Sequence, residues 1–285
     1  MKTSAENNVS RVPTCLAVHD LCTYAKSSLS VVIPVMEALG VEVCPLPTAV
    51  LSTQLDGFED VFHRNLDHCA REISACLRRE DIRFDCLYTG FLSTPKTAGL
   101  ARSLRSLLFP GALVAVDPVL GDYGRLYSGF GSPMVGAVRR NLEGADVIKP
   151  NWTEGCLLTG VPYVAEPEEA EVTMVLESLR SICTADIAMT DVPLRGVPSD
   201  RVMIACLSRD GDFRWLSHER EAHSLPGSGD FFCSVMVSAM LQGMPFFEAV
   251  EEAGRQTRLC IRLSLKAGYE HRHGISTALW TREKR

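Results

Sequence analysis

Short apolar, β-prone segments alternate with longer segments of helical period along almost the whole chain, and this alternation restricts the fold more than any other feature. Segments in this order form β-α-β units, whose strands run parallel and whose helices cover the sheet. The sequence therefore predicts an α/β fold with one domain, built on a central, mostly parallel sheet flanked by helices on both faces. Strands are expected at residues 13–18, 41–46, 84–89, 112–117, 145–148, 186–189, 201–207 and 213–216, and helices at 27–39, 59–79, 96–108, 133–141, 153–159, 166–182, 228–242 and 245–267.

Charge and composition exclude several classes of partner. The formal net charge of -6 argues against a nucleic-acid-binding protein, which needs a clustered excess of Lys and Arg. No apolar run approaches the ~20 residues of a membrane-spanning helix, and the first residues lack the apolar core of a secretory signal. The 11 cysteines show no zinc-like spacing, and His271 and His273 are expected to be solvated. We therefore expect a cytoplasmic protein that acts on small molecules, without a nucleic-acid or membrane partner.

The strongest candidate for chemistry is the run Gly227, Ser228, Gly229 and Asp230, which opens the apolar 228–242 helix. Glycines let the backbone approach an anion closely, and the free N–H groups and positive dipole end of a helix start attract it. Asp230 would then lie in the first turn, beside the bound anion. The same carboxylate could instead cap the helix, and the local sequence does not separate these two roles.

Two further motifs follow predicted strands, where parallel sheets place their ligand crevice. Asp117 and Asp122, separated by Pro and Gly turn residues, could hold a hydrated magnesium ion or could belong to a solvated turn. Asn151 and Glu154 stand at the start of the 153–159 helix, at the spacing of a capping box. A capping box is thus the structural alternative to a ligand-binding role for this pair.

Taken in series, the motifs resemble those of the pyridoxal kinase branch of the ribokinase-like superfamily. The combination of G-S-G-D, N-x-x-E and D-P-V-x-G-D is specific, unlike a lone glycine-rich loop. The resemblance implies a ribokinase-like domain at residues 12–268, a disordered or loosely held N-terminus at 1–11 and a C-terminal tail at 269–285. The matching segments are Val18-His19-Asp20, residues 44–53, Tyr88-Thr89-Gly90-Phe91, residues 117–122, Pro150-Asn151 with Glu154 and Gly160, and residues 227–230.

The resemblance implies ATP-dependent phosphorylation of the 5'-hydroxyl of pyridoxal, pyridoxine or pyridoxamine by a homodimer, with Mg2+ and a monovalent cation such as K+. Phosphoryl transfer requires mainly positioning and charge neutralisation, which the anion hole, a metal and one base could supply. Asp230 would accept the hydroxyl proton, and Gly227, Ser228 and Gly229 would hold the anion. The implied substrate contacts are Asp20, Ser52 and Phe91, the nucleotide contacts Asp117, Asp122, Lys149, Asn151 and Thr190, and the metal contacts Asp117 and Glu154.

The chain departs from the pattern of that family in three places. Gln54 and Leu55 replace a usual His-Thr pair near the substrate ring, and residues 21–26 contain no glycine where the family has a glycine-rich loop, which predicts a stiffer loop. Lys149 replaces the usual Thr, and it could contact a triphosphate or be a solvated strand end. Two alternatives therefore stay open, a hydroxymethylpyrimidine kinase and a catalytically weak carrier or sensor of pyridoxal or its phosphate.

Overall fold

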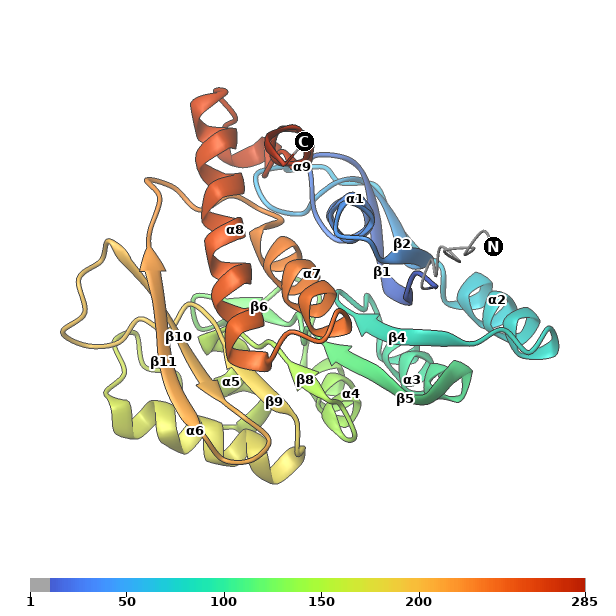
Figure 1. Ribbon diagram of the computed structural model, residues 1–285, viewed down its shortest axis with the longest axis horizontal. Coiled ribbons are helices and arrows are strands. Elements are labelled where there is room, and N and C mark those ends of the chain that lie inside the picture. Colours follow the sequence, from blue (N-terminus) through green and yellow to red (C-terminus); the bar gives the residue numbers. More distant parts are fainter. Residues whose placement is uncertain (1–10, 285) are drawn as a thin grey trace, which may run out of the picture.

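The alternating segments form one nine-stranded sheet in the computed structural model, which describes residues 11–284 (Figure 1). The strand order is β11-β10-β9-β8-β5-β4-β1-β2-β3. Pairing is parallel from β2 through β1, β4, β5 and β8 to β9, and antiparallel at both edges. The strands of this sheet are β1 (Thr14–Tyr24), β2 (Glu42–Thr53), β3 (His63–Asn65), β4 (Phe84–Thr89), β5 (Leu108–Val116), β8 (Val147–Ile148), β9 (Asp186–Met189), β10 (Arg201–Leu207) and β11 (Phe213–Glu219); β6 (Gly121–Asp122) and β7 (Arg125–Leu126) form a separate pair.

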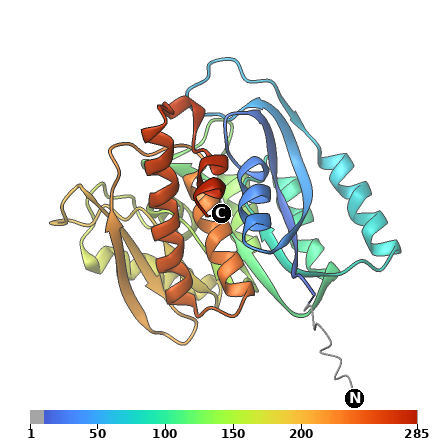
Figure 2. The ribbon, with the colours of Figure 1, turned by 45° about the horizontal axis from the view of Figure 1, so that its top comes forward.

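Helices cover both faces of the sheet. The first, seventh, eighth and ninth helices share one apolar core with one face of the strands, and the second to sixth share another with the opposite face. In Figure 2, α1, α7 and α8 lie side by side in front of the sheet. The helices are α1 (Leu29–Ala38), α2 (Asp67–Arg79), α3 (Pro95–Ser103), α4 (Ser132–Leu142), α5 (Trp152–Thr159), α6 (Glu169–Ile182), α7 (Ser228–Leu241), α8 (Phe246–Lys266) and α9 (Thr277–Glu283), with the 3-10 turns η1 (Leu104–Leu107) and η2 (His271–His273).

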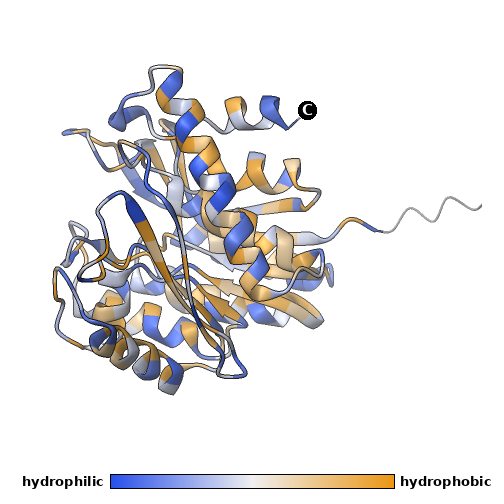
Figure 3. Cartoon of the chain, turned by 60° about the vertical axis from the view of Figure 1, so that its left-hand side comes forward, coloured by the Kyte–Doolittle hydropathy of each residue, from blue (hydrophilic) through white to orange (hydrophobic). Residues whose placement is uncertain are grey.

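Helix α8 shows why the helical segments pack as they do. Its buried residues recur three or four positions apart, so one face lies on the core while the other carries charged side chains, and Figure 3 shows the resulting mixture of hydrophobic and hydrophilic residues along it. In residues 11–284, none of the helices combines the length and apolar composition needed to cross a membrane. The predicted α/β class, with a mostly parallel sheet and helices on both faces, is confirmed.

Several predicted boundaries were wrong. The helix expected at 59–79 begins only at Asp67, because residues 63–65 pair with β2 as strand β3. Strands β1 and β2 run on to Tyr24 and Thr53, so most of the stretch at 21–26 that was expected to be a loop is a strand. Pairing with a neighbouring strand outweighs the polar residues in these segments.

The two chain ends were predicted to lie outside the domain. Residues 1–10 of the predicted loose N-terminus lie outside the described residues, while Arg11 pairs with Asp85. The segment predicted as a C-terminal tail contains η2 and α9. Within α9, the fully buried Trp280 packs edge-on against Phe231 at 4.9 Å and donates a hydrogen bond of 2.7 Å to Gln256. The packed core of the described residues therefore continues through α9.

Candidate active site

Strand β1, the ends of β5 and β8 and the start of α7 bring four charged side chains into one crevice: Asp20, Asp117, Lys149 and Asp230. Lys149 Nζ lies 2.8 Å from Asp117 Oδ2 and only 3.2 Å from the position that a Cβ on Gly229 would take. The charge of Asp230 acts on both Asp20 and Asp117. Residues predicted separately from four parts of the sequence thus form one cluster at the carboxyl edge of the parallel strands.

Asp230 uses its carboxylate for a contact with another loop. The backbone N–H of Ser28 donates to Asp230 Oδ2 at 2.8 Å, while Oδ1 lies 3.9 Å from His19 Nδ1. The start of α7 has no side-chain cap, so the capping alternative for Asp230 is wrong. Burial raises the pKa of Asp230, whereas the Ser28 hydrogen bond and the charge of Lys149 favour its ionised form. The arrangement suits a carboxylate that accepts a proton.

The turn before Asp230 requires glycine at position 227 and uses the small size of a second glycine at 229. Gly227 has a φ of 84°, in the left-handed region, and a Cβ there would lie 2.4 Å from the carbonyl oxygen of Lys26. The missing side chain of Gly229 leaves room for the ammonium group of Lys149. The turn can therefore present the first N–H groups of α7 and a cation to the same anion.

Lys149 is almost fully buried, with 6% of its surface exposed, so the alternative of a solvated strand end is wrong. Burial alone would lower the pKa of Lys149, but the carboxylates of Asp117 and Glu154 outweigh burial and raise it. Burial raises the pKa of Asp117 to about 6 although Lys149 opposes this change. Lys149 therefore carries a charge that little solvent screens.

Asn151 and Glu154 form the capping box that their spacing predicted. Asn151 Oδ1 accepts from the Glu154 N–H, and Glu154 Oε2 accepts from the Asn151 N–H, both at 2.8 Å. The other Glu154 oxygen accepts from the Leu120 N–H at 3.1 Å, and Asn151 Nδ2 donates to Gly121 O at 2.9 Å. Burial, followed by the charge of Asp117, raises the pKa of Glu154 to about 8. The pair thus fastens the turn after β5 to α5.

The two residues predicted to bind a metal differ in what they can offer. Asp117 Oδ1 is buried and has no hydrogen-bond partner among the described residues, whereas both oxygens of Glu154 accept backbone N–H groups. Within residues 11–284, no group of three or more His, Cys, Asp or Glu side chains could enclose a metal ion. Mg2+ often needs only one or two carboxylates because waters and phosphates complete its shell. Asp117 fits such an ion, and Glu154 fits a supporting position.

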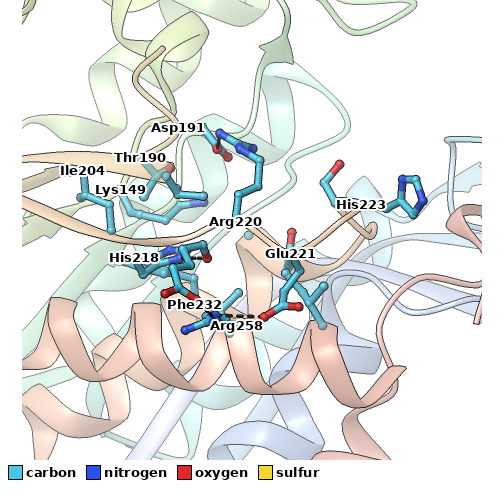
Figure 4. A pocket seen from close by; sticks show the side chains of 17 residues that line it. Lys149, Thr190, Asp191, Ile204, His218, Arg220, Glu221, His223, Phe232 and Arg258 are labelled. Atoms are coloured by element: carbon cyan, nitrogen blue, oxygen red, sulfur yellow. Dashed lines mark hydrogen bonds and ion pairs between the residues drawn. The ribbon is translucent and has the colours of Figure 1, made fainter. Parts of the chain in front are cut away.

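A pocket with a cavity volume of about 90 Å³ opens beside the start of α7 (Figure 4). Of the predicted nucleotide contacts, Lys149 and Thr190 line it, whereas Asp117, Asp122 and Asn151 do not. The exposed Asp122 accepts from the N–H of Tyr123 at 2.9 Å. Much of the wall comes from single residues on β10, β11, α7 and α8 that the sequence analysis missed, since they follow no strand end and form no motif: Ile204, His218, Phe232, Thr257, Arg258 and Ile261.

The three predicted substrate residues lie in different settings. Asp20 accepts from the thiol of Cys22 at 3.4 Å, and burial raises the pKa of Asp20 to about 6. Asp20 Oδ1 has no partner among the described residues. Ser52 Oγ accepts from the Phe62 N–H at 3.0 Å, and Phe91 stacks on Phe130 at 5.4 Å. These contacts place Asp20 in the charged cluster but do not join Ser52 or Phe91 to it.

Gln54 and Leu55, which replace the usual His-Thr pair, do not present their side chains to a ligand. The side-chain amide of Gln54 donates to the backbone oxygen of Asp56 and accepts from its N–H, the latter at 2.6 Å. Leu55 is 46% exposed. Gln54 therefore shapes this loop instead of offering its amide to a substrate.

His19 was part of a predicted motif, but no role was predicted for it from the sequence. Its ring is fully buried, and neither ring nitrogen has a hydrogen-bond partner among the described residues. Burial, and secondly the charge of Lys149, lowers the pKa of His19 to about 3, so the ring is neutral. A Cβ on Gly90 would lie 2.1 Å from His19 Nδ1, which explains the glycine in the Tyr88-Thr89-Gly90-Phe91 turn. His19 brings a neutral imidazole to the side of Asp230.

Comparisons with known proteins agree with this geometry. Residues 33–275 match the family model described as phosphomethylpyrimidine kinase. A pyridoxine/pyridoxal/pyridoxamine kinase from Bordetella bronchiseptica is 27% identical over 288 residues, which cover 94% of this chain and 96% of that protein. A protein from Bacteroides thetaiotaomicron with a provisional phosphomethylpyrimidine kinase name, crystallised with pyridoxal, is 31% identical, with a TM-score of 0.90 and 96% of each chain covered. Pyridoxal kinase from Lactobacillus plantarum is 27% identical, with a TM-score of 0.88 and 96% of each chain covered.

The similarity extends over nearly the whole chain and includes the sheet, both helical layers and the start of α7. The predicted ribokinase-like fold and the predicted relationship are therefore confirmed. The chain belongs to the phosphomethylpyrimidine kinase family and is a ribokinase-like kinase of its pyridoxal kinase branch.

Proposed function

We propose that this protein transfers the γ-phosphoryl group of ATP to the 5'-hydroxyl of a B6 vitamer, pyridoxal, pyridoxine or pyridoxamine. The observation that carries the proposal is Asp230, whose carboxylate lies at an uncapped helix start beside the buried cation Lys149. The pocket lined by Lys149, Thr190 and Gly229 lies next to it and offers a cation and a helix start to the phosphates of a nucleotide. The name of the Bordetella kinase and the pyridoxal in the Bacteroides crystals support a B6 vitamer as the acceptor.

The proposed chemistry needs one base and several positive groups. Asp230 accepts the proton of the acceptor hydroxyl. At the same time the hydroxyl oxygen forms a bond to the γ-phosphorus of ATP, and the bond from that phosphorus to ADP breaks. The N–H groups at the start of α7 and the ammonium group of Lys149 lie where they can balance the charge of the moving phosphoryl group. Burial of these groups strengthens each electrostatic contact, since little water screens them.

Asp117 is the residue we propose to hold Mg2+, directly or through water, with Glu154 fixing the turn that carries it. When bound, the ion would neutralise phosphate charge and orient the nucleotide. A requirement for K+, a homodimer and a cytoplasmic location stay predictions. Ser52 and Phe91 also stay proposed substrate contacts, with their present protein partners as the alternative.

A hydroxymethylpyrimidine kinase is the second candidate. The description of the matching family model and the provisional name of the Bacteroides protein favour it. Its acceptor is also a hydroxymethyl group on a nitrogen heterocycle, so the same base and anion hole would serve. The third candidate, a weakly catalytic pyridoxal carrier, leaves the charged cluster around Asp230 without a use.

One experiment separates the three candidates. The purified protein is incubated with Mg-ATP and, separately, with each B6 vitamer and with hydroxymethylpyrimidine, and acceptor-dependent ADP release and phosphorylated product are measured. We expect phosphorylation of at least one vitamer, with Asp230→Asn as the matched inactive control. Turnover of the pyrimidine alone would establish the second candidate. Tight pyridoxal binding without turnover of any acceptor would establish the carrier.

A further inference from the structure

Residues 269–275, which we call the strap, contact three loops, two of which lie beside Asp230 and the glycine turn before it. These loops are residues 25–28 after β1, residues 54–58 after β2, and residues 224–227 before α7. The His271 side chain is 51% exposed, as the expected solvation requires, but both of its ring nitrogens also face protein acceptors. The strap therefore has specific contacts that a solvated tail would not make.

The strap fastens the 54–58 loop through side chains. His271 Nε2 lies 2.5 Å from Asp56 Oδ2, and the guanidinium group of Arg272 lies 4.7 Å from the centre of the Phe58 ring. Gly57, with a φ of 79°, approaches Arg272 so closely that a Cβ would lie 3.2 Å from that of Arg272. These contacts involve partly exposed groups, so they are weak enough to open.

The same strap is bonded to the catalytic turn through its backbone. Ile275 N–H donates to Pro226 O at 3.1 Å, and Lys26 N–H donates to the carbonyl oxygen of His273 at 3.3 Å. A Cβ on Gly274 would lie 2.9 Å from the carbonyl oxygens of both Lys26 and Pro226. Since Lys26 O also abuts Gly227, a shift of the strap would be transmitted to the anion-binding turn.

We propose that His271 is a positioning residue whose protonated ring holds the 54–58 loop on the strap and so sets the position of that loop relative to the Pro226–Gly227 turn. The consequence for catalysis rests on the proposed function, in which the acceptor alcohol binds beside this turn. The structural consequence, order in the 54–58 loop, does not depend on what the protein phosphorylates.

The charges around His271 give the direction of the pH effect. Asp56 faces its Nε2 and the Ser224 carbonyl oxygen its Nδ1, while Glu270, Arg272 and His273 are its neighbours on the strap and His223 and Lys26 lie on the adjoining loops. The hydrogen bond with Asp56 raises the pKa of His271 above 6.5. The pairing is therefore complete below pH 6.5 and is lost as the pH rises through the raised value.

Amide hydrogen exchange of residues 54–62 in the full chain tests the proposal without any substrate. After correction for intrinsic rates, we expect exchange about three- to fivefold faster at pH 8.5 than at pH 6, the size of a partly exposed ion pair. His271→Gln should exchange fast at both pH values. His271→Arg, which keeps a cation throughout, should exchange slowly at both. His68→Gln removes an exposed histidine that pairs with Glu72 on α2, and it should match the wild type.

Kinetics supply a second measurement. His271→Gln should raise KM for the acceptor about three- to fivefold and leave KM for ATP within about twofold, while His271→Arg restores the acceptor KM and flattens its pH dependence. Exchange at 54–62 that ignores pH in the wild type, or an Arg variant that keeps the wild-type pH dependence, overturns the proposal. Absence of turnover with every acceptor would contradict only the proposed function, since the exchange experiment would still decide the role of His271.

Discussion

Replacing Lys149 by Met tests whether the buried ion pair at the centre of the site is as tightly coupled as its geometry indicates. The substitution keeps much of the side-chain volume and removes the charge that lies 2.8 Å from Asp117 Oδ2. Asp117, only 2% exposed, then has no cation to balance it. Removing one partner of a buried pair costs about 3–5 kcal/mol when the other stays charged.

The loss of stability should grow with pH, and the sign follows from Asp117. In the wild type the pKa of Asp117 is raised to about 6, so above that pH the carboxylate is ionised beside Lys149. Without Lys149 the folded-state pKa rises further, and the folded protein keeps a proton that the unfolded chain releases. Stability present at low pH is then lost as pH rises, at about 1.4 kcal/mol for each pH unit. From pH 6 to 8 the deficit should therefore widen by about 3 kcal/mol.

Urea unfolding at pH 6, 7 and 8 measures this deficit. The double variant Lys149→Met, Asp117→Asn removes the titrating group, so its stability should show no such widening. Arg102→Met is the matched surface control, because the Arg102–Glu143 pair, at 2.7 Å, has side chains that are 44% and 49% exposed. Arg102→Met should lower the free energy of unfolding by less than about 1 kcal/mol at every pH. A deficit relative to the wild type that is equal at pH 6 and pH 8, or one that also widens with pH in the double variant, would refute the coupling.

Three further variants test other parts of the structure. Asp230→Asn keeps an acceptor for the Ser28 N–H, so calorimetry should find unchanged nucleotide affinity while kcat falls by about 10²–10⁴. Turnover at the wild-type rate would show that Asp230 is not the base. Ala25 has a φ of 62°, so Ala25→Gly should raise the free energy of unfolding by up to about 1 kcal/mol in urea titrations. A lower free energy of unfolding would show that the backbone at Ala25 is not strained. Trp280→Ala should lower the free energy of unfolding by about 3–5 kcal/mol. An unchanged urea midpoint would show that α9 does not contribute to the stability of the core.

The sequence predicted the β-α-β order because each buried strand and each amphipathic helix carries its own periodicity. It did not predict where β1 and β2 end, because residues such as Asp20 and Thr23 are as polar as loop residues. These two strands continue as partners, with Cys22 opposite Leu51 and Tyr24 opposite Thr53. Strand β3 likewise exists because β2 offers it an edge. Strand pairing of this kind depends on the partner strand, and no local pattern contains it.

For the site, the sequence predicted the charged cluster and missed most of the pocket wall. Asp117 and Lys149 come directly after parallel strands, Asp20 follows the apolar part of β1, and the topology of such sheets places these positions together. His218 and Arg258 come from an antiparallel edge strand and from the middle of α8, where no rule connects them. The strap was missed for a similar reason, since Asp56 and His271 are 215 residues apart and meet only in the folded chain.

Unused hydrogen-bonding capacity separates the ligand-binding candidates from the residues that support them. Asn151 and Glu154 have the polarity of a binding motif, yet both oxygens of Glu154 and both polar atoms of Asn151 already serve the capping box and the turn after β5. Asp20 and Asp117 each keep one buried oxygen without a partner among the described residues. An unpaired buried acceptor is costly, so a fold that retains two of them beside a buried ammonium group gains when a ligand supplies the missing donors or cation. Neither spacing nor residue type distinguishes these two pairs, because the distinction depends on which backbone N–H groups the folded chain brings to each carboxylate.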